Sequence, residues 1–451
     1  MTSRITTCCV LASLMPALAA AQQASPSTGE RLSLNTAIRL AVENNRQVRT
    51  ALLQVEKADA DVAVARTRRL PSFETEATGS QLLTPVSFSF PRGAFGEFPG
   101  TGPIPAADTS VNVPQQPTMY VSSQVSQPLT QLVRIGLGIR SATATRDIER
   151  EHARAQQLSV VNEVKRLYFA ILSTESALAA TEDAIALYRE LERTVQVRVA
   201  QNVALRSDGL DVQYRLAEEE LARTTRQNTL ASQKEQLNQL LGRDVRSVFD
   251  VEDVSAISLL DVDLDTARTR ALESRPDVRE ARLKLQQAEL DRRLTKADRI
   301  PEVSLSLSYS SYFNIDMLPA NLASLGVRVK WEPFDWGRKS RELAVKDVTI
   351  QQARLGVREA EDRTVVEINS RFRTVAEKRA ILRVVQMAQN ATREKLRVKS
   401  NQYQIQAALL PDVLQVRADL ADATDRYQQA LMGFWTAKAD FDHSVGEEVI
   451  P

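Results

Sequence analysis

The sequence predicts a mainly α-helical protein with a small β part, built of long antiparallel coiled-coil helices and four short strands. Three observations predict this fold class. The chain of 451 residues repeats itself, long proline-free stretches carry a coiled-coil period, and two pairs of segments alternate between apolar and polar residues. Aromatic residues are 5% and charged residues 25% of the chain, which favours elongated helices over one dense globular core.

Residues 1–21 are typical of a secretory signal peptide. Arg4 provides a positive start, an apolar run reaches Leu18, and the alanines around it offer a small-residue cleavage site. Both cysteines, Cys8 and Cys9, fall inside this segment, so we expect no disulfide and no thiolate site in the mature chain. No run of about 18 apolar residues follows, so any membrane-crossing segments would have to be strands.

Charge and motif content argue against a nucleic-acid binder and against an enzyme. Removal of Arg4 leaves 57 basic residues (58 − 1) against 57 acidic ones, which gives no bulk signature of nucleic-acid binding. The sequence has no glycine-rich phosphate loop, and the two histidines, His152 and His443, are far apart. We therefore expect no catalytic residues, no metal and no cofactor.

The chain is a tandem duplication. A shift of 230 positions (264 − 34) superimposes Leu34–Ala37 on Leu264–Ala267 and continues without a gap to Pro71 and Pro301. Later segments match at a slightly smaller shift. We predict a first repeat over residues 22–250 and a second over 251–451.

Each repeat begins with a helix that ends at a proline. Apolar residues step by three and four from Val48 to Ala65, which is the spacing of a helical seam. Pro71 and Pro301 end these helices, because proline disfavours the helical conformation of the residue before it.

A pair of strands follows in each repeat. Val303, Leu305, Leu307 and Tyr309 alternate with serines, and residues 325–331 alternate in the same way. The first repeat carries a fainter version around Phe73 and Val121. The period of two and the length suit strands that cross a membrane. The segment between the first two strands is rich in proline, glycine and phenylalanine, as expected of a long loop on the outer face of a membrane barrel.

The rest of each repeat is long helix. Residues 141–202 contain no proline and would span on the order of 90 Å at 1.5 Å per residue. From Val413 to Phe441 apolar residues alternate steps of three and four without a break, and this 3.5-residue period predicts left-handed coiled-coil pairing.

Four strands cannot seal themselves in lipid. Open sheet edges leave unpaired backbone groups, which cost several kcal/mol each in hydrocarbon, so membrane strands must close into a barrel. Because the smallest common barrels have eight strands, several chains would have to share one barrel. Three copies would supply twelve strands, enough for a water-filled lumen.

These features resemble the TolC family of outer-membrane efflux proteins. The resemblance depends on Leu34–Ile38 with Asn44–Asn45, on Ala271–Val278, and on Trp331–Arg338 with its first-repeat partner Gln127–Leu129. It implies a homotrimer in the outer membrane of a Gram-negative bacterium, with a twelve-stranded β-barrel continuous with a periplasmic α-helical barrel. It also implies a passive exit duct that works with a periplasmic adaptor and with an inner-membrane RND, ABC or MFS pump, in efflux or in type I secretion.

The resemblance also suggests residues at the periplasmic entrance. Tyr403, Asp412 and Asp211 stand where the family has a tyrosine and two facing aspartates, whereas Ala408 and Gln415 replace an arginine and a second aspartate. We expect the hairpin tips to be marked by Gly209 and Pro411. Alternatively, Asp211 and Asp412 are only helix N-caps.

Five aromatic residues flank the second strand pair and are expected to form an interfacial belt against outer-membrane lipid. They are Tyr309, Tyr312, Trp331, Phe334 and Trp336. The alternative is that they pack where the barrel meets the helices. For the whole chain, the competing hypothesis is a soluble periplasmic coiled-coil scaffold or adaptor.

Overall fold

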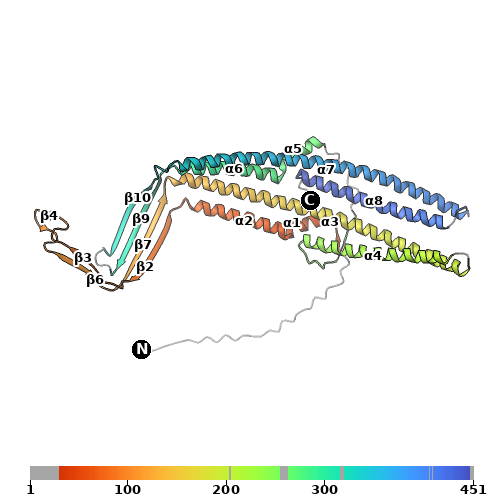
Figure 1. Cartoon of the computed structure of the whole chain (residues 1–451), viewed down its shortest axis with the longest axis horizontal. Helices are drawn as coiled ribbons and strands as arrows, with labels where there is room; N and C mark the ends of the chain where they lie inside the picture. Colours follow the sequence, from red (N-terminus) through yellow and green to blue (C-terminus); the bar gives the residue numbers. More distant parts are fainter. Residues whose placement is uncertain are drawn as a thin grey trace, which may run out of the picture.

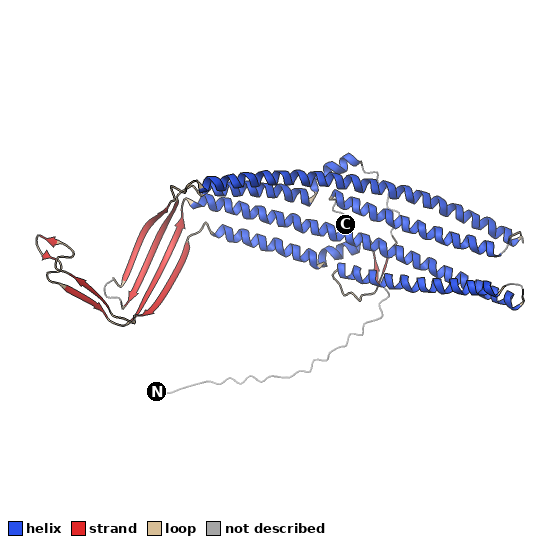
Figure 2. Ribbon diagram, in the orientation of Figure 1, coloured by secondary structure: helices blue, strands red, loops and turns tan. Residues whose placement is uncertain are grey.

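The protein is a long rod of helices that ends in a β-sheet (Figures 1 and 2). The computed structural model describes residues 30–202, 205–253, 263–314, 319–405, 407–408 and 410–446. The predicted signal peptide, residues 1–21, lies outside the described residues. Within the parts of the chain that are described, none of the helices combines the length and the apolar character that a membrane span requires.

The two halves repeat one order of elements: a short helix, a longer helix, a strand pair and two long helices. In the first half these are α1 (Leu34–Asn44), α2 (Arg46–Thr67), β2 (Ser72–Gln81), β7 (Pro117–Pro128), α3 (Gln131–Ala200) and α4 (Arg206–Leu240). In the second half they are α5 (Leu264–Ser274), α6 (Pro276–Ala297), β9 (Glu302–Phe313), β10 (Asn321–Lys330), α7 (Arg338–Gln404) and α8 (Leu410–Val445). Pro71 and Pro301 stand directly before β2 and β9, four residues beyond the ends of α2 and α6.

The duplication extends to the break between the first two helices of each half. Asn45 ends α1 with extended backbone (φ −62°, ψ 130°), and its side-chain oxygen accepts from the amides of Gln47 and Val48 to start α2. Arg275 occupies the matching place between α5 and α6 with nearly the same backbone (φ −63°, ψ 132°), and Pro276 there takes the first helical position. Repeated local chemistry thus produces the same bend twice.

The long helices pack side by side. α3 has 70 residues and so runs about 105 Å at 1.5 Å per residue. α8 lies along α7 (Figure 1), and the predicted seam from Val413 to Phe441 is buried or half-buried. The coiled-coil prediction is therefore confirmed.

The apolar core lies at the waist of the rod, where a parallel pair of short strands, β1 (Glu30–Leu32) and β8 (Phe249–Val251), crosses α3. Leu32, Phe249 and Tyr168 of α3 are fully buried there. A smaller cluster in the second half joins α5, α7 and α8 around Ile368. The sequence did not predict the strand pair, because three-residue strands carry no periodicity.

The long loop between β2 and β7 forms an arm of two small hairpins. They are β3 (Val86–Phe90) with β6 (Thr109–Val113), and β4 (Glu97–Phe98) with β5 (Gly102–Pro103). The arm projects beyond the end of the sheet that is remote from the helices (Figure 1). The arm stands where the sequence predicts a long loop between two strands, and its location on the outer face of a membrane stays a prediction.

Candidate functional site

The first helix hairpin reverses direction at the end of the rod opposite to the sheet (Figure 1). α3 ends at Ala200, and Asn202 takes a left-handed conformation (φ 58°). α4 then starts after Leu205, whose amide donates to the Asp208 carboxylate at 3.2 Å. Asp208 therefore caps this helix and interacts favourably with its positive N-terminus.

Two of the predicted residues lie just beyond this turn, inside α4. Gly209 is in the first turn of the helix, and the reversal itself comes earlier in the chain. Asp211 is exposed and is the sixth residue of α4. The alternative that Asp211 is a helix N-cap is therefore wrong, because the N-cap position of α4 is held by Leu205, six residues earlier in the chain.

The second hairpin lies at the same end of the rod. Asp412 is the third residue of α8, so it sits in the first turn and not at the cap position. Its carboxylate is exposed and lies 4.0 Å from the Lys399 ammonium of α7. Gln415 is also exposed, and it donates to Asp419 at 2.9 Å within α8.

The remaining predicted tip residues can be placed only in part. Ala408 is half-buried in the connection between α7 and α8. Tyr403 belongs to α7 and Pro411 to α8, but their side chains lie outside the described residues. The entrance role of these residues stays a prediction.

The four-stranded sheet has one apolar and one polar face. Its strand order is β10-β9-β7-β2, and all pairs are antiparallel. Directly paired residues share a face, so the register places Phe73, Val125, Leu307 and Leu325 on one side. The other side carries Glu74, Glu76, Arg328, Lys330 and most of the serines.

This register divides the predicted aromatic belt. Tyr309 lies on the apolar face, opposite Ala323. Tyr312 lies on the polar face, where its ring contacts that of Tyr120 with 5.1 Å between centroids. Tyr312 therefore departs from the predicted belt, because it is an odd number of residues from Tyr309.

The other three aromatic residues follow β10 and are well exposed. Trp331, Phe334 and Trp336 have 61%, 68% and 87% of their surface accessible in the single chain. Phe334 and Trp336 meet edge to face at 4.7 Å. Trp336 has a positive φ of 55°, and the pair lies just beyond the end of β10 at Lys330. Their contact with lipid stays a prediction.

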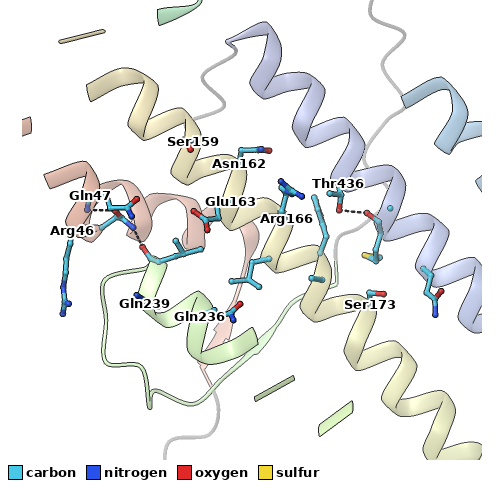
Figure 3. Close-up of a pocket in the computed structure, with 18 residues that line it drawn as sticks. Arg46, Gln47, Ser159, Asn162, Glu163, Arg166, Ser173, Gln236, Gln239 and Thr436 are labelled. Atoms are coloured by element: carbon cyan, nitrogen blue, oxygen red, sulfur yellow. Dashed lines mark hydrogen bonds between the residues drawn. The ribbon is translucent and has the colours of Figure 1, made fainter. Parts of the chain in front are cut away.

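A polar pocket of about 870 Å³ opens at the waist, between α3, α8, the start of α2 and the end of α4 (Figure 3). Arg46, Arg166 and Glu163 line it together with amides and hydroxyls. Asn162 donates to Asp440 at 3.0 Å on its rim. Charges of both signs are mixed, so the lining favours no single class of ligand.

No metal site is apparent in the described parts of the chain, where no three histidine, cysteine or acidic side chains cluster to hold an ion. Asp263 is the N-cap of α5. It accepts from the amide of Thr266 at 3.0 Å, and this hydrogen bond lowers the pKa of its carboxyl.

Three solved structures share this fold over most of their length. The chain has a TM-score of 0.73 with the Campylobacter jejuni CmeC outer membrane channel, at 17% identity over 92% of this chain and 85% of that one. It has a TM-score of 0.70 with the open state of the Neisseria gonorrhoeae MtrE outer membrane channel, at 18% identity over 92% and 88%. A membrane protein from Pseudomonas aeruginosa gives 0.73 at 18% identity over 91% and 93%.

Family membership follows from the sequence itself. The model of the outer membrane efflux protein family matches residues 37–243 and 267–443, one segment in each half. The chain belongs to the outer membrane efflux protein family. A comparison with curated protein sequences found no match. The predicted family, fold class and role as an exit duct, not an enzyme, are confirmed by these findings.

Proposed function

We propose that three copies of this chain form one duct through the outer membrane of a Gram-negative bacterium. The observation that carries this proposal is the four-stranded sheet with two unpaired edges. β2 runs away from the helices and β10 runs back toward them, so β2 of one copy can pair with β10 of the next in the same antiparallel sense. Closure into a barrel pairs the backbone N–H and C=O groups of the edge strands, which would otherwise have no hydrogen-bond partner in lipid.

The two faces of the sheet assign lipid and lumen. The face with Phe73, Val125, Leu307 and Leu325 would meet lipid, and the face with the serines and charged residues would line water. The helices would continue the duct into the periplasm, where the two hairpin tips would meet a periplasmic adaptor and an inner-membrane RND, ABC or MFS pump. The boundaries of the two repeats, 22–250 and 251–451, belong to this proposal.

Fractionation and assembly test this function together. We expect the protein to stay in the outer membrane through salt and carbonate washing, and to be a trimer in mild detergent by light scattering. Release by carbonate as a soluble species would favour the competing periplasmic scaffold. A stable monomer in detergent without channel activity in a planar bilayer would contradict the duct.

Replacement of Asp412 tests the entrance. Three copies of this exposed carboxylate at the pore mouth would favour cations. We expect Asp412→Ala to lower the cation-to-anion permeability ratio by about two- to threefold in a planar bilayer under a salt gradient. Gln415→Ala, one turn further along α8, is the control because it removes a neutral side chain. An unchanged reversal potential for Asp412→Ala would place this residue away from the mouth.

A further inference from the structure

The two edge strands of the sheet carry opposite charges on the same face. β2 presents Glu74 and Glu76, and β10 presents Arg328 and Lys330. The register places all four on the polar face. Glu74 pairs with Gln124 and Arg328 pairs with Ser304, which both lie on this face, and Glu76 and Lys330 are each two residues further along the same strands. All four are exposed, and none of their side chains makes a hydrogen bond or an ion pair with another described residue of its own chain.

We propose that these charges set the register in which neighbouring copies join, with Glu74 opposite Lys330 and Glu76 opposite Arg328 of the next copy. This inference depends on the proposed trimeric duct and specifies the contact that closes it. The partner is a second copy of this chain.

The stagger within one sheet points to this register. β7 ends at Pro128, two residues beyond Ser126, which pairs with Ser72 at the start of β2. β9 begins at Glu302, two residues beyond the partner of Pro128. Lys330 at the end of β10 lies directly opposite Glu302. The strand end near the helices therefore lies two residues further toward them in β7 than in β2, two further again in β9, and level with β9 in β10.

The seam between copies, where β10 of one copy pairs with β2 of the next, must continue this stagger in the same direction. The shift there has to be even, since an odd shift would exchange the two faces. A shift of two, as in both non-zero steps, places Lys330 opposite Glu74 and Arg328 opposite Glu76. A shift of zero leaves Glu76 without a basic residue opposite it in the next copy, and a shift of four leaves Glu74 without one.

Barrel geometry narrows the choice independently. Each copy adds its seam shift to the four residues of stagger inside its own sheet. We take a rise of about 3.3 Å per residue and a spacing of about 4.8 Å between strands. In a twelve-stranded barrel, seam shifts of zero, two and four residues then tilt the strands from the barrel axis by about 35°, 46° and 54°. Barrel strands tilt by about 35–45°, which disfavours a shift of four. The pairing of charges then selects two over zero.

Other partners within the chain do not account for these charges. Glu302, the cross-strand neighbour of Lys330, accepts a hydrogen bond from the guanidinium of Arg134 in α3 at 2.9 Å. Arg328 lies opposite Ser304, and Glu74 lies opposite Gln124. Opposite charges stabilise a cross-strand pair and like charges destabilise it, so the four charges favour one register and penalise slippage.

Cysteine cross-linking tests the register directly. The chain has no cysteine beyond Cys8 and Cys9 in the predicted signal peptide. Directly opposite strand residues are close enough for a disulfide, whereas pairs offset by two residues are not. We expect the double variant Glu74→Cys/Lys330→Cys to give about tenfold more covalent trimer on oxidation than either matched control. The controls are Ser72→Cys/Lys330→Cys for a shift of zero and Thr78→Cys/Arg328→Cys for a shift of four.

The outcomes separate the two proposals. Stronger cross-linking of either control, in a protein that is trimeric in detergent, overturns the register and leaves the duct intact. Absence of any trimer overturns both. Charge reversal gives a second measurement: Glu74→Lys/Glu76→Lys should lower the temperature at which the trimer dissociates, and added Arg328→Glu/Lys330→Glu should restore it. Failure of the combined variant to recover would contradict the pairing.

Discussion

Alanine in place of Gly242 is expected to destabilise the protein strongly, although it adds only one methyl group. Gly242 follows the end of α4 with a φ of 69°, a conformation that costs other residues about 1–2 kcal/mol. A Cβ at this position would also overlap the backbone carbonyl of Asn44, at the bend between α1 and α2. The carbonyl is backbone and cannot rotate away, so the bend itself would have to shift.

The total loss for Gly242→Ala should be about 2–4 kcal/mol. It can be measured by urea unfolding of the detergent-solubilised protein, followed by helical circular dichroism. Gly337→Ala is the matched control, because Gly337 has a φ of 80° but nothing within 4 Å of its added Cβ. The control should lose only the conformational part. Equal losses for both variants would show that the contact with Asn44 has no energetic consequence.

The duplication explains why this position is demanding in both halves. Gly446 also has a positive φ, and its Cβ would approach Ser274 and Arg275 at the bend between α5 and α6. The packing of these glycines could not be predicted from the sequence, since each contact joins residues far apart in the chain. Only the folded chain places the end of one long helix against the bend of a shorter one.

The sequence predicted the two faces of the sheet better than its aromatic residues. Alternation alone separates Leu305 and Leu307 from the serines between them, and the register confirms this division. The same parity could have separated Tyr312 from Tyr309, but proximity in sequence grouped them. The pairing of Tyr312 with Tyr120 could not be predicted, because it depends on which strands are neighbours.

The tips were predicted less well than the strands, for a physical reason. A helix cap needs only a short polar side chain near the first turn, and several residues near each turn qualify. Asp208 takes this role at the start of α4, and no local pattern favours it over Asp211. Helix existence follows from long-range periodicity, whereas the last few residues of each helix depend on local alternatives of similar energy.

Removal of the Tyr168 hydroxyl is expected to loosen the waist of the rod. Tyr168 is fully buried on α3, and its hydroxyl lies 2.8 Å from the carbonyl of Leu32 and 2.7 Å from that of Glu252. It also accepts from the Glu252 amide at 2.9 Å. One hydroxyl thus ties β1 and the end of β8 to the longest helix. Tyr168→Phe would leave buried polar backbone groups without this partner and should cost about 1–3 kcal/mol.

The effect should depend on pH in a defined window. Burial raises the pKa of Tyr168 to about 12 from 10.0, because a phenolate there would lose water. Below pH 10 the tyrosine is neutral in both states, so its contribution to stability is fully present. Between pH 10 and 12 only the unfolded state releases the proton, so the contribution falls as pH rises. The difference in unfolding free energy between the wild type and Tyr168→Phe should therefore shrink across this window.

Tyr188→Phe on the same helix is the control, since the Tyr188 hydroxyl has no hydrogen-bond partner among the described residues. It should leave stability nearly unchanged at neutral pH. Urea unfolding of the three proteins at pH 8, 10 and 11.5 makes the comparison. A difference between wild type and Tyr168→Phe that stays constant with pH would mean that the hydroxyl is not buried. A difference near zero at pH 8 would mean that the strand pair is held to α3 by packing alone.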